Sequence, residues 1–223
     1  MTFSLVARCA RTGQFGMVIS SSSPAVAARC AHVRADVGAV ASQNITDPAL
    51  GPLILDQLAQ GLTAPDALAA ITKGRTHIDY RQLLVVDGDG ATAIHSGSQV
   101  LGNWGEAQGL DCAAGGNLLA SDAIPAAMVA AFQIAKGHLG ERLMLALEAG
   151  LAAGGEAGPV HSAGLKVADR LDWPLVDLRI DWADDPVGML RSAWDIFAPQ
   201  MAAYVQRAED PTQAPSYGVP GDE

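Results

Sequence analysis

The sequence is poor in cysteine and in positive charge. Three cysteines in 223 residues, odd in number and widely spaced, argue against a disulfide framework, and no CxxC pair indicates a zinc site. Lysine and arginine number 14 against 24 acidic residues, which gives a formal net charge of −10. Such a chain repels nucleic acid, so we expect no nucleic-acid partner. The few, widely spaced cysteines are expected to be buried, reduced thiols.

Long hydrophobic runs are missing too, although the mean hydropathy is +0.19. No apolar run reaches the roughly 18 residues that a bilayer requires, and no basic segment followed by an apolar one resembles a secretory signal. We therefore expect no membrane partner and a cytoplasmic location. The length fits a single domain over residues 1–210, followed by an extended tail rich in proline and glycine over residues 211–223.

Motifs for metals, nucleotides and serine hydrolases are also missing. The five histidines form no HxH or HxxxH pair, and there is no GxSxG, GxGxxG or GxxxxGK[ST] sequence. The DGDG at 87–90 has only the first two acids of a calcium loop and is typical of a hairpin turn. We expect neither a metal nor a cofactor.

What the sequence does contain is a regular series of strand and helix patterns. Hairpin signals near the start require antiparallel sheet, and runs of strands separated by pairs of helices favour an α+β sandwich over a βαβ array. We expect strands at about 2–7, 17–23, 37–43, on both sides of 87–90, and at 111–115, 163–168 and 176–182. We expect helices at about 47–60, 63–72, 122–136, 140–153 and 185–207.

The last helix carries an apolar stripe and contains Pro199, which should kink it. Its apolar residues recur every three or four positions, at Leu190, Trp194, Phe197, Met201 and Tyr204. The stripe could pack on a sheet or form a surface for self-association. We expect a homodimer.

Thr2 is a residue whose position gives it chemical meaning. An initiator methionine before a small residue such as threonine is generally removed, which would give Thr2 a free α-amine. A hydroxyl is a weak nucleophile until a base takes its proton, and an α-amine titrates at about 7.7 to 8.0. Thr2 could therefore supply both nucleophile and base. The alternative is that it merely begins a buried strand.

A series of motifs resembles one known family. Between Thr2 and Asp181 the chain contains, in order, TFSLVARC, GMVISSSSPAVAARC, VRADVGAVASQNITDPALGPLILDQLAQGL, HSGS, GGNLLA, AGGEAGPVHSAGLKV and VDLRID. This series resembles the bacterial and archaeal DUF1028 family, which is placed in the N-terminal nucleophile (Ntn) hydrolase superfamily. The resemblance implies a four-layer αββα sandwich, with two antiparallel sheets between helix layers, and hydrolysis of amide bonds. It implies no particular substrate.

The resemblance also implies roles for individual residues. Thr2 would be the nucleophile, and the end of the second strand, with Ser22 and Ser23, would face it. Arg34 lies where a proteasome-like subunit has a charge-tuning lysine, but an arginine cannot shuttle a proton and could only lower the amine pKa or hold an anion. Asn117 in GGN would donate to the oxyanion, helped by the amides before it, or would instead cap the following helix.

Further candidates would bind the substrate. Gln43 and Asn44 end a central strand, where their amides suit a polar substrate, although strand-to-helix turn chemistry explains them equally. His161 and Ser162 stand in the glycine-rich loop where many relatives have Arg or Gln followed by Ser. In the same loop, Glu156 and the following alanine replace a common Asp-Arg pair. Substrate preference therefore cannot be taken from the family.

Three functions are compatible with these observations. The first is an Ntn-type hydrolase that cleaves an amide or related C–N bond of a small-molecule substrate through Thr2, once Met1 has left. The second is a non-catalytic small-molecule-binding protein of the same fold. The third uses the Cys30 thiol with His32 as its base, since residues two apart share a strand face.

Overall fold

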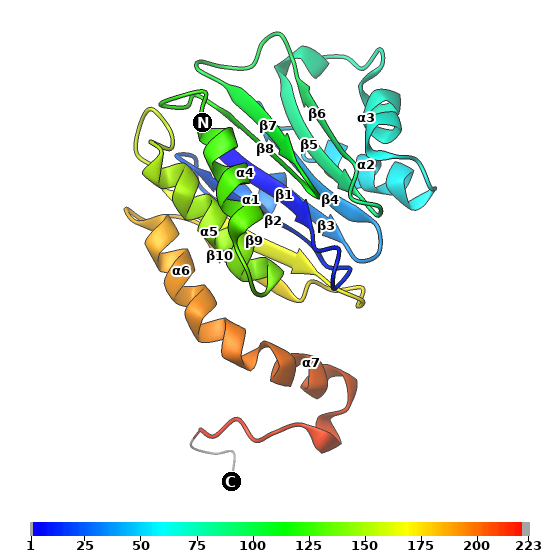
Figure 1. Cartoon of the computed structure of the whole chain (residues 1–223), viewed down its shortest axis with the longest axis vertical. Helices are drawn as coiled ribbons and strands as arrows, with labels where there is room; N and C mark the ends of the chain where they lie inside the picture. Colours follow the sequence, from blue (N-terminus) through cyan, green and yellow to red (C-terminus); the bar gives the residue numbers. More distant parts are fainter. Residues whose placement is uncertain (1, 220–223) are drawn as a thin grey trace.

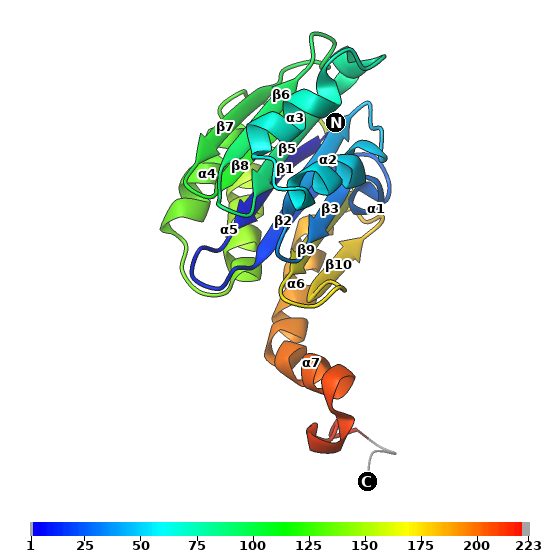
Figure 2. The ribbon, with the colours of Figure 1, turned by 90° about the vertical axis from the view of Figure 1, so that its right-hand side faces the viewer.

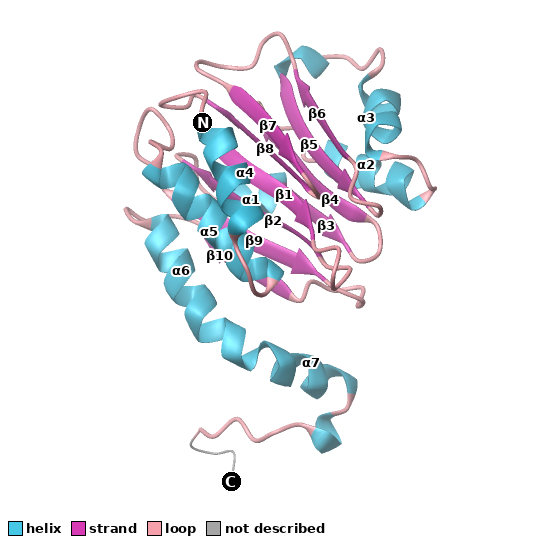
Figure 3. Ribbon diagram, viewed as in Figure 1, coloured by secondary structure: helices cyan, strands magenta, loops and turns pink. Residues whose placement is uncertain are grey.

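The computed structural model describes residues 2–219 and contains two antiparallel sheets. The larger sheet has the order β10 (Val176–Ile180), β9 (Ser162–Ala168), β2 (Phe15–Ser21), β1 (Thr2–Arg8), β8 (Cys112–Asn117) and β7 (Gly105–Gly109). The smaller has the order β3 (Ala31–Arg34), β4 (Gly38–Asn44), β5 (Arg81–Asp87) and β6 (Thr92–Ser96). Figure 3 shows the two sheets in magenta with helices beside them.

Helices cover the outer face of each sheet (Figures 1 and 2). On the smaller sheet lie α2 (Leu50–Ala59) and α3 (Ala64–Thr72). On the larger sheet lie α4 (Ile124–Ile134), α5 (Leu139–Ala152) and α6 (Pro186–Phe197). Three apolar clusters fill the two helix–sheet interfaces and the space between the sheets. The expected α+β fold, with two antiparallel sheets between helix layers, is confirmed.

Side-chain alternation along β1 explains why this strand lies at the centre of the fold. Phe3 and Leu5 belong to the cluster under the helices, whereas Val6 belongs to the cluster between the sheets. Successive side chains of a strand point to opposite faces, so Thr2 and Ser4 share the inner face with Val6. β1 is therefore buried on both sides, and every residue from Thr2 to Ala7 is buried.

The space between the sheets is apolar at one end and polar at the other. Val6, Met17 and Val86 occupy the apolar end. At the opposite end of the same strands, the inward positions carry polar side chains that are fully buried, namely Ser4, Ser21, Gln43, Gln82 and Asn117. Burying a polar group costs free energy unless the group is hydrogen-bonded. The polar side chains at this end must therefore be arranged so that they bond to one another or to the backbone.

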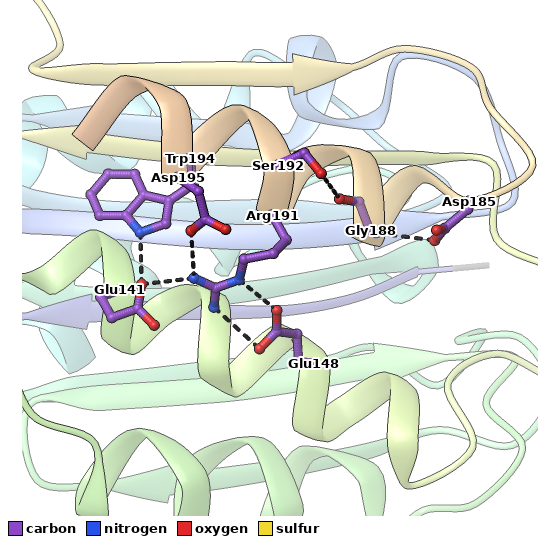
Figure 4. A network of polar contacts seen from close by, with 8 residues as sticks. All are labelled: Glu141, Glu148, Asp185, Gly188, Arg191, Ser192, Trp194 and Asp195. Atoms are coloured by element: carbon purple, nitrogen blue, oxygen red, sulfur yellow. Dashed lines mark hydrogen bonds and ion pairs between the residues drawn. The ribbon is translucent and has the colours of Figure 1, made fainter. Parts of the chain in front are cut away.

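Helix α6 is fixed to α5 by one arginine (Figure 4). The Arg191 guanidinium donates to both Glu148 oxygens at 2.7 and 3.1 Å and to Glu141 Oε2 at 2.7 Å. Trp194 Nε1 donates to the same Glu141 oxygen at 2.7 Å. Leu190 and Trp194 are also buried. Helix α6 therefore packs through its apolar stripe, and the ion pairs of Arg191 attach one side of it to α5.

Several boundaries differ from the sequence-based expectation. A short helix, α1 (Val26–Cys30), and strand β3 stand where no element was expected, and β7 was also missed. The expected helix over 185–207 is divided at Pro199, as predicted, into α6, a 3-10 turn (Ala198–Gln200) and α7 (Met201–Glu209). Two further 3-10 turns are Ile78–Tyr80 and Pro211–Gln213.

The expected extended tail begins at this last turn, and its residues 220–223 lie outside the described part of the chain, as does Met1. Within residues 2–219, no helix has the length and apolar character needed to cross a membrane.

Candidate functional site

Thr2 begins the strand that has β2 on one side and β8 on the other. It pairs in register with Asn117, the last residue of β8, so the two side chains lie on the same face about 5 Å apart at Cβ. Its Oγ1 is 3.4 Å from Ser21 Oγ at the end of β2. The side chain is 4% exposed. The Thr2 hydroxyl is thus held at the polar end of the space between the sheets.

A chain of buried hydrogen bonds joins the two sheets beside Thr2. Ser4 Oγ donates to Gln43 Oε1 at 2.6 Å, and Gln43 Nε2 donates to Gln82 Oε1 at 2.9 Å. Asn117 Nδ2 donates to the same Gln82 oxygen at 3.2 Å. Gln82 Nε2 in turn donates to Ser96 Oγ at 3.1 Å. This network fixes the rotamers of the amides and makes the site rigid.

One acceptor of the network is left open. Asn117 is fully buried, and within residues 2–219 its Oδ1 has no hydrogen-bond partner. An unpaired buried acceptor is uncommon, and it marks a place where a donor from another molecule would be stabilised. The alternative role of Asn117, as the cap of the following helix, is wrong, because α4 starts at Ile124 and its N-cap is Ala123.

The serine stretch after β2 forms a tight cluster next to Thr2. Ser21 Oγ and Ser23 Oγ are 2.9 Å apart, and the Ser23 amide donates to Ser21 Oγ at 3.1 Å. The Ser22 amide donates to the two carboxylate oxygens of Glu156 at 3.0 and 3.1 Å. Ser22 and Ser23 therefore lie at the Thr2 end of the sheet, as the resemblance implied.

Glu156 is a functional candidate to which the sequence assigned no role. Its carboxylate binds Ser22 just beyond β2, while its backbone forms a β-bridge with Leu119 just beyond β8. β1 lies between these two strands, so Glu156 links the end of β2 to the end of β8 across the beginning of β1. The sequence signal is an acid in the loop GGEAG, at the place where the resemblance implies an Asp, but a surface loop would equally contain one.

Burial raises the pKa of Glu156 to about 7, although the Ser22 hydrogen bonds and the charge of His161 oppose the change. Its side chain is only 5% exposed. A carboxyl with this pKa changes its protonation state near neutral pH, and such groups are enriched at functional sites.

His161 and Ser162 also lie at this end, but with structural partners. The His161 ring stacks on Trp182 with centroids 4.4 Å apart, and its Nδ1 lies 3.1 Å from the Ala183 carbonyl oxygen. Ser162 Oγ donates to the Ser23 carbonyl at 2.7 Å and accepts from the Val26 amide at 3.2 Å. Ser162 thus shapes the turn that contains the serine cluster.

Gln43 and Asn44 separate into two roles. Gln43 is part of the buried network and reaches the larger sheet through the Gly115 carbonyl at 3.2 Å. Asn44 has φ of 70°, donates to the Tyr80 carbonyl at 2.6 Å and accepts from the Leu101 amide at 3.2 Å. The side chain of Asn44 therefore performs the turn chemistry that was the alternative prediction, whereas that of Gln43 binds Ser4, which shares the inner face of β1 with Thr2.

The structure does not bring Arg34 to Thr2. Arg34 pairs with Gly38 at the first residue of β4, whereas Gln43, near the other end of β4, reaches the β1 segment that starts at Thr2. Its guanidinium instead forms a half-exposed ion pair with Asp56 at 2.9 Å. Because β3 runs antiparallel to β4, its C-terminal residue is carried to the far end of the sheet.

Cys30 and His32 do not share a strand face, so that expectation is wrong. Cys30 ends α1, while His32 is the second residue of β3. Cys30 Sγ lies 3.5 Å from Thr46 Oγ1, and burial raises the pKa of its thiol. Burial also lowers the pKa of His32. A thiol with a raised pKa is a poor nucleophile. In residues 2–219, no group of three or more His, Cys, Asp or Glu residues is placed to hold a metal ion.

Comparison with solved structures finds proteins whose folds are similar to that of this chain. The crystal structure of protein SPO2555 from Silicibacter pomeroyi, labelled DUF1028, is 29% identical and superposes with a TM-score of 0.82 over 88% of this chain and 89% of that one. Anbu, the ancestral beta-subunit from Yersinia bercovieri, is 10% identical with a TM-score of 0.40 over 91% and 97%. Among curated proteins, none matches the chain. The model described as "Family of unknown function (DUF1028)" matches residues 2–190, and the chain therefore belongs to the DUF1028 family.

Proposed function

We propose that this protein is an Ntn-type hydrolase that cleaves an amide or related C–N bond of a small metabolite through Thr2. The proposal rests on one observation. The Thr2 hydroxyl lies at the first position of the central strand, at the polar end of the space between the sheets, with Ser21 on one side and Asn117 on the other.

The reaction requires that the Met1–Thr2 peptide bond be cleaved, which would make the Thr2 nitrogen a primary amine. That amine takes the hydroxyl proton as Oγ1 attacks the substrate carbonyl carbon, giving a tetrahedral oxyanion. Collapse of the oxyanion breaks the C–N bond, and the departing nitrogen receives the proton that the amine holds. Water, activated by the same amine, then hydrolyses the ester on Thr2 and releases the acid.

Asn117 is suited to two contacts in this reaction. Its Nδ2 has two hydrogens and gives one to Gln82, which leaves the other for the oxyanion. Its unpaired Oδ1 offers an acceptor beside Thr2 for an N–H group of the substrate. An oxyanion donor of this kind is typically worth about 3 to 4 kcal/mol in the transition state.

Glu156 supports the same assignment as a positioning residue. It spans the beginning of β1, where the new amine would lie, and its carboxylate is held by the Ser22 amide. A carboxylate at this place would orient the ammonium form of the amine and compensate its charge.

The first test is whether Thr2 becomes the N-terminal residue and reacts. Intact-mass measurement of the native protein should show loss of Met1, and a β-lactone probe should add one acyl group that peptide mapping places on Thr2. Thr2→Ala should give no adduct, while the matched Thr2→Ser variant keeps the hydroxyl and should react. Quantitative retention of Met1, or equal labelling of Thr2→Ala, would overturn the mechanism.

The second test identifies the substrate and separates catalysis from binding. A metabolite library is screened for turnover and for binding with Met1-free protein. We expect a compound with an amide or related C–N bond to be hydrolysed by wild type and only bound by Thr2→Ala. A ligand that both proteins bind equally, with no turnover by either, would instead indicate the non-catalytic binding protein of the same fold.

A further inference from the structure

A polar cavity lies at the end of the larger sheet opposite to Thr2. Its volume is about 370 Å³. The turn after β1, the β7–β8 turn and the connection from α4 to α5 form its walls, with Arg8, Arg11, Asp111, Lys136 and Arg142 among the lining residues. β1 runs from Thr2 to Arg8 (Figure 1), so the cavity is separated from Thr2 by roughly 20 Å of extended strand.

The cavity concentrates positive charge in a protein of net charge −10. Four cationic side chains line it against one acid, Asp111, which gives a local sum of 4 − 1 = +3. Asp111 is already paired with Arg8 at 3.1 Å. Within residues 2–219, neither Arg11 nor Lys136 has a carboxylate within ion-pair distance. Like charges held around one cavity repel, and an anion between them would relieve that repulsion.

Two of the four cations are held in place yet keep an unused donor. Arg8 Nη1 donates to Asp111 Oδ1 and to the Asp89 carbonyl, each at 3.1 Å. The Arg142 guanidinium lies over the Phe132 ring, 4.0 Å from its centroid, and Nη2 donates to the Phe132 carbonyl at 3.3 Å. In the described chain, the Nε atoms of Arg8 and Arg142 are both buried without an acceptor. Fixed guanidinium groups with open N–H donors suit an oxyanion.

The positive charge around the cavity also affects the pKa of a thiol in its wall, that of Cys9. Cys9 lines the cavity and is 4% exposed. Burial raises the pKa of its thiol, but hydrogen bonds with Thr12 and Arg11 and the charge of Arg142 lower that pKa by more, so that it lies below its usual value. The surroundings of Cys9 therefore favour negative charge.

We propose that this cavity is a binding site for a phosphate group, carried by a small phosphorylated metabolite and separate from the Thr2 site. Arg8 and Arg142 would bind the phosphate oxygens from fixed positions, while the exposed Arg11 and Lys136 close around them. A dianionic phosphate compensates more of the local charge than a single carboxylate does. The cavity is larger than a phosphate ion alone needs, which leaves room for the rest of the metabolite.

The test compares two probes on the full chain by calorimetry and thermal unfolding. Glycerol 3-phosphate and inorganic phosphate are titrated separately at constant ionic strength, with chloride as the reference salt. The variant Arg11→Gln/Lys136→Gln removes two exposed cations from the cavity. The control Lys73→Gln/Arg75→Gln removes the same charge just beyond α3, on the other helix layer. Circular dichroism checks that both variants are folded.

We expect saturable binding of glycerol 3-phosphate by wild type and by the control variant, weakened about tenfold or more in Arg11→Gln/Lys136→Gln. Both probes should raise the unfolding temperature, and the ester should bind more tightly than the ion. Tighter binding of inorganic phosphate would contradict the metabolite and indicate a site for the free ion. No saturable binding of either probe, or equal weakening in the control, would overturn the site.

Discussion

Among single residues, Glu156 combines deep burial with a charge that titrates near neutral pH. Its carboxyl has an ordinary pKa of 4.5 and a pKa of about 7 in the folded protein, because burial disfavours the charged form. Between these values the folded state binds more protons than the unfolded state. The free energy of unfolding therefore falls as the pH rises from about 4.5 to 7 and levels off above that.

Glu156→Gln should remove this cost. We expect the variant to match wild type near pH 4.5 and to be more stable by about 2 kcal/mol at pH 8, measured by urea unfolding at both pH values. Glutamine keeps one oxygen for the Ser22 amide. As a control, the exposed Asp122→Asn should show no such pH dependence. A stability gain that is equal at both pH values would mean that ionisation of Glu156 is not its cause.

Sequence reasoning could place some of these residues but not others. Thr2, Asn117 and Ser22 lie at or just beyond strand ends, and antiparallel pairing gathers such ends at one edge of a sheet. Glu156 comes to the same edge through a loop that crosses the start of β1, and no local pattern encodes that path. The prediction that Arg34 lies near Thr2 is wrong for a related reason. Arg34 ends β3, a strand that the sequence did not indicate, and the antiparallel pairing of β3 with β4 carries Arg34 to the far end of the sheet.

At the scale of elements, α6 depends on the Arg191 contacts with α5 that Figure 4 shows. Burial raises the pKa of Glu141, but hydrogen bonds from Arg191 and Trp194 lower it below its usual value. The stabilisation from Glu141 is therefore present above its ordinary pKa of 4.5 and lost as the pH falls below that.

Arg191→Met keeps the aliphatic length but leaves Glu141 and Glu148 without their partner. We expect a loss of about 1 to 2 kcal/mol at pH 7, measured by urea unfolding, and a smaller loss at acid pH, once protonation of Glu141 has removed its charge. The matched Arg170→Met breaks a more exposed pair with Glu209 and should leave the stability unchanged. Equal losses in the two variants would contradict the special role of Arg191.

The elements that were missed lack the usual sequence signals. The helix α1 runs directly into β3 at Ala31, so no glycine or proline separates them. The strand β7 reads GEAQG, with neither a β-branched nor an aromatic residue, and it owes its conformation to pairing with β8. Elements with clear periodicity, such as α5 and β10, were predicted because their own residues define a face.

At the scale of the whole molecule, the fold class could be predicted from the order of the elements. Which helix faces are buried and which are exposed could not. The stripe that suggested self-association is largely turned inward, since Leu190 and Trp194 are buried and Phe197 and Met201 pack against the same cluster. Another face of α6 is left to solvent, with Met189 51% and Ile196 68% exposed. A sequence pattern shows that a helix has an apolar face but not what covers it.

The homodimer stays a prediction, and the outer face of α6 is where we place it. Met189 and Ile196 lie on an open groove that Ile180 of β10 also lines, and β10 is one of the two edge strands of the larger sheet. A second copy of the chain would cover both the apolar groove and the unpaired strand edge.

Met189→Asp/Ile196→Asp places two like charges from each protomer into that contact. We expect light scattering after gel filtration to give a dimer for wild type and a monomer for the variant, with association weakened about 100-fold or more. Ile134→Asp changes a residue that is 82% exposed at the end of α4, and it should leave the dimer intact. A monomeric wild type would contradict the dimer. A dimer that survives the double substitution but not Ile134→Asp would place the interface at α4, on a different part of the surface.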